Sequence, residues 1–119
     1  MAMNKNKLFL MLALFGILSS VNSQTKHWVK FSNKTGTPYS LSTPSAFLTP
    51  AAIQRRATYA VPYHVTDLPV TPSYINQVEA VPNVTVLYAS KWLNGVVVSI
   101  SSGSATALAT ISSFTFVSS

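Results

Sequence analysis

The sequence predicts an α+β fold in which four strands form an antiparallel sheet and two helices pack on one of its faces. Three observations predict it. Short alternating or β-branched segments indicate strands, two segments that open on Thr-Pro or Ser indicate helices between them, and a stretch rich in Gly, Pro, Ser and Thr interrupts the series. With residues 33–72 set aside as an insertion after the first strand, the order is βαββαβ, the pattern of ferredoxin-like folds.

The first strand is expected over residues 27–32, where the side chains alternate between two faces. Trp28, Lys30 and Ser32 would share one face, and the other three residues would share the opposite one. Residues 33–43 are expected to form a loop, because Gly, Pro, Ser and Thr dominate them.

A short helix is expected over residues 49–57, inside the insertion. Thr49 can cap it, Pro50 suits its first turn, and Arg55 and Arg56 lie near the negative end of the helix dipole. We interpret the two arginines as complementing that dipole from a solvated face. A dibasic processing site or an anion contact is the alternative.

Residues 59–72 contain three prolines, so we expect them to be extended and to lie outside the centre of a sheet. A second helix is expected to begin after Thr71. Its inner face would carry Tyr74, Ile75 and Val78, and a proline closes it.

Two further strands are expected over residues 84–89 and 93–100. Asn94-Gly95 between them favours a tight turn, so the two strands should be antiparallel neighbours. The face of the sheet without helices would lie open to water or to a partner. Because the register is not set by the sequence, the candidates for this open face are Trp28, Thr85 or Val86, and Val97 or Ser99.

A third helix is expected to start with Ser104 as its N-cap. Spacing of i, i+3, i+4 and i+7 assigns its inner face to Ala105, Leu108, Ala109 and Ser112, with Ile111 at the border. Residues 114–117 are expected to form the last strand.

The N-terminus has the features of a secretory signal peptide, expected over residues 1–23. Two lysines precede an apolar run, residues 8–18, which is shorter than the roughly 20 residues that a membrane-spanning helix needs. Val21 and Ser23 supply small residues at the −3 and −1 positions if cleavage precedes Gln24. We therefore expect a secreted or periplasmic protein that has no membrane segment after cleavage.

Residues 24–119 suit one small domain. The formal charge of the whole chain is +6, and two of its eight Lys and Arg residues lie in the expected signal peptide. The remaining charges are scattered apart from Arg55-Arg56. A basic stripe that would neutralise phosphates is missing, so nucleic acid is not expected as a partner.

The sequence offers little material for catalysis or metal binding. It has no cysteine, and its other titratable candidates are His27, His64, Asp67 and Glu79. From these residues we expect no thiolate zinc site, no other metal site and no catalytic pair of carboxylates. His64 and Asp67 are three residues apart, but in an extended chain their side chains would diverge. We expect no catalytic residues, no cofactor and no enzymatic activity of the chain itself.

Three segments stand out as motifs: FLTPAAIQRR at 47–56, DLPV followed by YI at 67–75, and SKWLNGVVV at 90–98. In this order they resemble the N-terminal propeptides, inhibitor I9-like, of the subtilisin-like serine peptidases (family S8) that Bacteroidetes secrete. This chain has Thr49 where the family has Ser, Gln54 where a charged residue is common, and Gly95 in place of Ala. We expect these departures to leave the fold undisturbed.

The resemblance implies a propeptide of βαββαβ type that lays its open sheet face on two surface helices of the catalytic domain, in cis or in trans. It implies an intramolecular chaperone that also inhibits the enzyme until it is cleaved. The chain stops at Ser119, before the tail and the catalytic domain of such precursors, so we expect a truncated product, a fragment or a free-standing inhibitor-like domain. The family-motif residues with an expected structural or interface role are Arg55, Arg56, Asp67, Leu68, Pro69, Trp92, Asn94 and Gly95.

A small secreted binding or adhesion module without a protease partner is the alternative function. In that case Trp28, Trp92 and the tyrosines would contact a sugar or a surface. A role in the core is the simpler interpretation for both tryptophans, because each lies in or beside a predicted strand.

Overall fold

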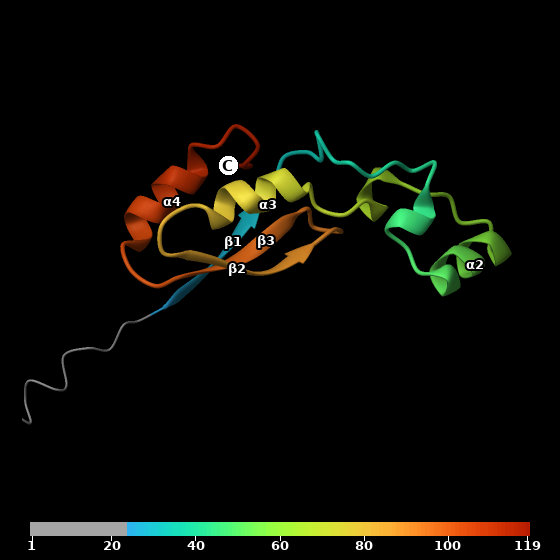
Figure 1. The fold of residues 1–119 in the computed structure, drawn as a ribbon, viewed down its shortest axis with the longest axis horizontal. Coiled ribbons are helices and arrows are strands. Elements are labelled where there is room, and N and C mark those ends of the chain that lie inside the picture. Colours follow the sequence, from blue (N-terminus) through green and yellow to red (C-terminus); the bar gives the residue numbers. More distant parts are fainter. Residues whose placement is uncertain (1–23) are drawn as a thin grey trace, which may run out of the picture.

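The computed structural model describes residues 24–119, and the signal peptide expected over residues 1–23 lies outside them. The fold is α+β, as predicted, and Figure 1 shows its elements along the chain. They are β1 (Thr25–Lys30), the 3-10 turn η2 (Pro44–Ala46), α2 (Pro50–Thr58), the 3-10 turn η3 (Val65–Asp67), α3 (Pro72–Glu79), β2 (Val84–Ser90), β3 (Gly95–Ile100) and α4 (Ser104–Ser112).

The sheet has three strands in the order β1-β3-β2, and both neighbouring pairs are antiparallel. The predicted hairpin of β2 and β3 is confirmed, and its turn contains Asn94 with a φ of 49°. A bulge between Val86 and Tyr88 shifts the register within β2.

The predicted fourth strand, residues 114–117, is wrong, so the sheet is not the four-stranded one expected. Only Val117 pairs with the first strand segment, in a single antiparallel bridge to Phe31. The chain leaves α4 through tight turns instead, because Phe114 N donates to Ile111 O and Val117 N donates to Phe114 O, both at 3.1 Å. Phe116 is thereby turned into the core, where it stacks on Tyr74 with ring centroids 4.1 Å apart.

The hydrophobic core lies between one face of the sheet and the helices α3 and α4, which Figure 1 shows together on that face. Each strand contributes alternate residues to it, as the pleat of a strand requires. The buried members are Val29, Phe31, Val70, Val78, Val81, Val84, Val96, Val98, Ile100, Ala107, Ile111 and Phe116.

Two of the three helices begin where the sequence predicts, and one of them, α2, has the expected side-chain cap. Thr49 Oγ1 accepts a hydrogen bond from Ala52 N at 3.2 Å, and α3 begins at Pro72 and buries Val78, as predicted. In α4, however, Ser104 is the first helical residue rather than the cap, and Gly103 precedes it with a φ of 62°.

The inner face predicted for α4 is correct for Leu108 and wrong for Ala105, Ala109 and Ser112. Ala107 and Ile111 are buried and Leu108 is partly buried, whereas Ala105 and Ala109 are exposed. The helix is built largely of Ala, Ser and Thr, whose weak contrast in hydrophobicity leaves the periodicity to be decided by tertiary packing.

Residues 33–69 form a lobe that extends beyond the end of the sheet and carries α2 (Figure 1). We call it the insertion lobe. Helix α2 has no buried residue, and every member of the core cluster lies outside 33–69. The segment expected to be extended, 59–72, is interrupted by η3. None of the helices in residues 24–119 is long and apolar enough to cross a bilayer.

Candidate functional site

An apolar row crosses the centre of the sheet face that α3 and α4 leave uncovered. Trp28 of β1 lies opposite Val97 of β3, and Tyr88 of β2 lies opposite Val97 from the other side. Trp28 is 43% exposed and Tyr88 is 62% exposed. Leu87, at the bulge, is 44% exposed. Exposed apolar side chains gathered in this way are typical of an interaction surface.

The register settles the candidates for this open face. Thr85 pairs with Ser99, and both share the face of Trp28 and Val97. Val86 is partly buried against the core on the opposite face.

Lysines flank the apolar row along β1. Lys26 and Lys30 are exposed and lie two residues on either side of Trp28, hence on the same face of the strand. Asp67 and Glu79, the acidic residues of the sequence, lie in η3 and α3 instead. The open face is therefore apolar at its centre and positive along one edge.

Gly95 lets the indole of Trp28 lie close to strand β3. A Cβ atom at this position would clash with the carbonyl oxygen of Val29 and would lie 2.7 Å from Cζ2 of Trp28. The family's Ala at this position could not be accommodated here without a shift of the backbone. The Gly at position 95 is therefore coupled to the placement of Trp28.

The turn between β2 and β3 presents a second exposed aromatic group. Trp92 is 57% exposed and Leu93 is 64% exposed. Lys91 Nζ lies 4.8 Å from the centroid of the Trp92 ring, within the range of a cation–π contact. With Trp28 and Trp92 both exposed, the interpretation that the two tryptophans are core residues is wrong.

Asn94 ties this turn to the end of the first strand. The side-chain Nδ2 of Asn94 donates to the backbone carbonyl oxygens of Phe31 at 3.1 Å and of Asn33 at 2.9 Å. The backbone carbonyl oxygen of Asn94 accepts a hydrogen bond from Phe31 N at 2.7 Å. Asn33 Oδ1 in turn accepts from the hydroxyl of Tyr74 at 2.6 Å. The family-motif Asn therefore has a structural role as a clamp.

The insertion lobe is held together by an ion pair between two motif residues. Arg56 donates to both carboxylate oxygens of Asp67, at 2.8 and 2.7 Å, and Asp67 is 2% exposed. His64 N donates to the same carboxylate at 2.9 Å. Burial raises the pKa of Asp67, but the hydrogen bonds from His64 and Arg56 and the positive charges of Arg56 and Lys91 outweigh it and hold the pKa below its usual value.

Two expectations about these residues are corrected. Arg56 is not on a solvated face, because it binds Asp67 as an internal anion contact, whereas Arg55 is exposed in the last turn of α2. The carboxylate of Asp67 does contact His64, but it accepts a hydrogen bond from the backbone N–H and not from the imidazole ring. The contact therefore stabilises the turn and does not orient the imidazole as a catalytic base.

Lys34 joins the insertion lobe to the hairpin turn, a role that sequence reasoning missed. Its Nζ donates to the carbonyl oxygens of Val65 at 3.0 Å, Thr66 at 3.3 Å and Lys91 at 2.9 Å, and also to that of Leu68. Burial lowers the pKa of Lys34, the charge of Lys91 lowers it further, and Asp67 acts in the opposite direction. No sequence pattern marks this cluster, because its acceptors are backbone atoms distant along the chain.

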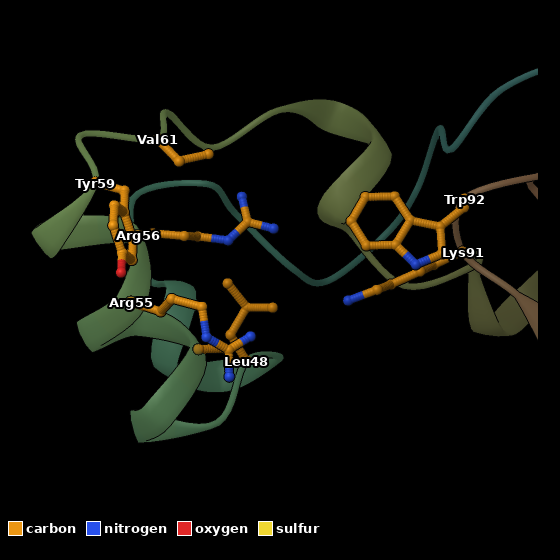
Figure 2. A pocket seen from close by; sticks show the side chains of 8 residues that line it. Leu48, Arg55, Arg56, Tyr59, Val61, Lys91 and Trp92 are labelled. Carbon is orange, nitrogen blue, oxygen red and sulfur yellow. The ribbon is translucent and has the colours of Figure 1, made fainter.

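A hollow of about 440 Å³ separates the insertion lobe from the hairpin turn (Figure 2). We call it the lobe–hairpin hollow. Cationic and apolar side chains line it, from α2 and its flanks on one side and from the β2–β3 turn on the other. They are Arg55, Arg56 and Lys91, together with Leu48, Ala52, Tyr59, Val61 and Trp92.

The structure thus divides the motif residues into two groups. Arg55 and Trp92 line the hollow with exposed side chains, from opposite sides. Arg56 also lines the hollow, but it is bound to the buried Asp67. The others stabilise the surrounding structure: Leu68 is buried, Pro69 is half-buried beside it, and Asn94 and Gly95 hold the hairpin against β1. Residues 24–119 contain no group of three or more His, Asp or Glu side chains placed to hold a metal ion.

A protein-family model matches nearly all of the described residues. The family model described as peptidase S8 propeptide domain, Bacteroidota, matches residues 26–119. The match includes the open face, the insertion lobe and the hairpin. No curated protein and no solved structure matches the chain.

Proposed function

We propose, since this chain belongs to the peptidase S8 propeptide family of Bacteroidota, that it is the propeptide domain of a secreted subtilisin-like serine protease. In this role it is an intramolecular chaperone and a temporary inhibitor of the catalytic domain. A propeptide domain is not itself catalytic, and the family implies association with an S8 catalytic domain. Residues 1–23 would act as the signal for export and residues 24–119 as the propeptide domain.

The observation that carries the proposal is the apolar row on the open face. Trp28, Val97 and Tyr88 form a continuous strip across all three strands, and no element of residues 24–119 covers it. Burying apolar surface stabilises a complex by roughly 25 cal/mol per Å². A catalytic domain that lies on this face would supply the burial that the strip lacks.

The chaperone role follows from how little the domain buries alone. One face of a three-stranded sheet packs against two short helices, and the insertion lobe adds no residue to the core cluster, its buried apolar residue being Leu68. A domain without disulfides and with so thin a core is marginal by itself. A partner that binds only the folded form stabilises it, and the same coupling lets the folded propeptide template its partner.

The test is inhibition in trans. The chain would be added to the catalytic domain of a Bacteroidota S8 peptidase while hydrolysis of a chromogenic peptide is followed. We expect concentration-dependent inhibition, which Tyr88→Asp weakens because it places a charge in the exposed apolar row. Ala105→Asp adds the same charge on the exposed side of α4 and should leave inhibition unchanged. Equal inhibition by both variants would contradict the proposed docking face.

A binding or adhesion module is a second candidate, because Trp28 and Tyr88 are exposed on the open face and Trp92 is exposed in the hairpin turn. Aromatic faces of this kind stack on sugar rings as well as on protein. Retention of the chain on immobilised glycans, lost in Trp92→Ser, together with no effect on any S8 catalytic domain, would favour this function.

A further inference from the structure

We propose that the lobe–hairpin hollow is a second docking point, which binds a segment of the peptidase domain that carries a carboxylate beside an apolar side chain. The inference rests on the proposed function for the identity of the partner. It concerns a surface distinct from the open sheet face, formed by the insertion lobe and the tip of the hairpin.

The charge of the hollow is the first argument. Arg55 and Lys91 contribute from opposite sides, and Figure 2 shows the Lys91 side chain reaching toward the lobe. Within residues 24–119 the ion pair of Arg56 and Asp67 is the only one, so neither Arg55 nor Lys91 has an ion-pair partner there, and Asp67 acts on Lys91 only from a greater distance. A carboxylate placed between two cations without ion-pair partners is attracted by both.

The neighbourhood of the hollow already shows the effect of this charge. Burial is the main cause that lowers the pKa of Lys34, and the charge of Lys91 lowers it further while Asp67 acts in the opposite direction, so Lys91 opposes a further cation in this region. Arg56 also lines the hollow, but its charge is compensated by Asp67. An anionic group would relieve the repulsion, and a neutral or basic one would not.

The apolar part of the lining gives the second requirement. Leu48, Val61 and the ring of Trp92 line the same space as the cations, and Trp92 is 57% exposed. A free inorganic anion would leave these surfaces in contact with water. An acidic residue next to an aliphatic one satisfies both kinds of wall, and a hollow of about 440 Å³ is large enough for such a pair.

The two sides of the hollow are held at a fixed separation. Lys34 Nζ binds the carbonyl of Lys91 on the hairpin side and those of Val65 and Thr66 on the lobe side. Groups that are fixed before binding lose less entropy when a ligand arrives. The hollow also adjoins the turn of the strand that carries Tyr88, so one partner surface can reach both the open face and the hollow.

The first arm of the test uses the chain alone. The probe is a blocked tetrapeptide, Gly-Asp-Leu-Gly, and its control is Gly-Asn-Leu-Gly, with tryptophan emission recorded in Trp28→Phe so that the signal comes from Trp92. We expect the acidic peptide to change the emission in a saturable manner that added salt weakens, and the amide peptide to leave it unchanged. Equal responses to the two peptides would overturn the proposal.

The second arm measures inhibition of the S8 catalytic domain by paired variants. Removing both charges, in Arg55→Gln with Lys91→Gln, should weaken inhibition about tenfold, the effect of two partly exposed ion pairs. Exchanging them, in Arg55→Lys with Lys91→Arg, keeps both charges and should retain most of the inhibition. Unchanged inhibition by the Gln pair would overturn the proposal.

The two arms separate failure of this inference from failure of the proposed function. If the unmodified chain does not inhibit, the proposed function fails, and the peptide arm alone decides whether the hollow selects a carboxylate. If the chain inhibits and Tyr88→Asp weakens it while the Gln pair does not, the open face is the docking site and the hollow is not.

Discussion

Arg56 and Asp67 form a bidentate ion pair that joins helix α2 to the turn η3, with both N–O distances below 3 Å. The pair connects two of the three family motifs across the insertion lobe. Asp67 is buried while Arg56 is partly exposed, so the carboxylate depends on the guanidinium far more than the reverse. The stability of the lobe should therefore follow the charge of Asp67.

The first prediction is that acid loosens the insertion lobe. The pKa of Asp67 is lower in the folded chain than in the unfolded one, so ionised Asp67 stabilises the fold at pH values above its unfolded pKa, about 3.9. That contribution is lost as the pH falls through the lower, folded pKa. The protection of the α2 amides, measured as their exchange rate relative to the intrinsic rate at each pH, should fall on acidification, and in Asp67→Asn it should be low already at neutral pH. Equal protection of α2 in both chains at neutral pH would contradict the prediction.

The second prediction concerns Lys34. Lys34→Met keeps much of the aliphatic stem but removes the ammonium that four carbonyl oxygens share. We expect the lobe to separate from the hairpin turn, with a loss of about 1–3 kcal/mol in the free energy of local opening. Limited proteolysis of residues 59–69 measures it. Lys26→Met removes an exposed lysine from β1 and should leave the cleavage rate unchanged.

The third prediction concerns the close approach at Gly95. Gly95→Ala introduces a Cβ that collides with the backbone of Val29 and the ring of Trp28, and strain of this kind costs about 1–3 kcal/mol. The thermal midpoint should fall. Gly36→Asn is the control, because Gly36 has a φ of 76° that Asn tolerates and has no neighbour within 4 Å of the added atom. A midpoint equal to that of the unmodified chain in Gly95→Ala would show that β3 can shift freely.

The fourth prediction separates the two roles of Asn94. Asn94→Gly keeps the positive φ but loses the side-chain hydrogen bonds to Phe31 and Asn33, whereas Asn94→Ala loses both features. Chemical denaturation should give a smaller loss of unfolding free energy for Gly than for Ala. Each lost hydrogen bond should account for about 1 kcal/mol. The reverse order would mean that φ is not limiting at this turn.

Local signals predicted the parts of the fold that depend on neighbours in sequence. Thr49 caps α2, Pro72 begins α3, and Asn94 turns the hairpin, because capping and turn preferences act over a few residues. The family motifs also placed Arg56 and Asp67 in one functional set, although only the structure shows that they contact one another.

The errors fall where tertiary contacts decide. Residues 114–117 have β-branched and aromatic side chains suited to a strand. Stacking of the two phenylalanines with each other and with Tyr74 stabilises the fold more than strand pairing would, so the chain turns. Trp28 lies in a strand as expected, yet its exposure depends on which face the helices cover. The carbonyl cluster around Lys34 joins residues more than thirty positions apart and leaves no pattern to detect.

The domain is modular, because every member of the core cluster lies outside positions 33–69. Asn33 and Thr71 bracket the lobe, and the hydroxyl of Tyr74, three residues beyond Thr71, binds Asn33, so the two points where the lobe joins the sheet layer are close neighbours. A short linker could bridge them without interrupting the packing of α3 and α4 on the strands. The insertion lobe can therefore change in length and sequence without altering the packing of the helices on the sheet, and that packing can change without altering the lobe.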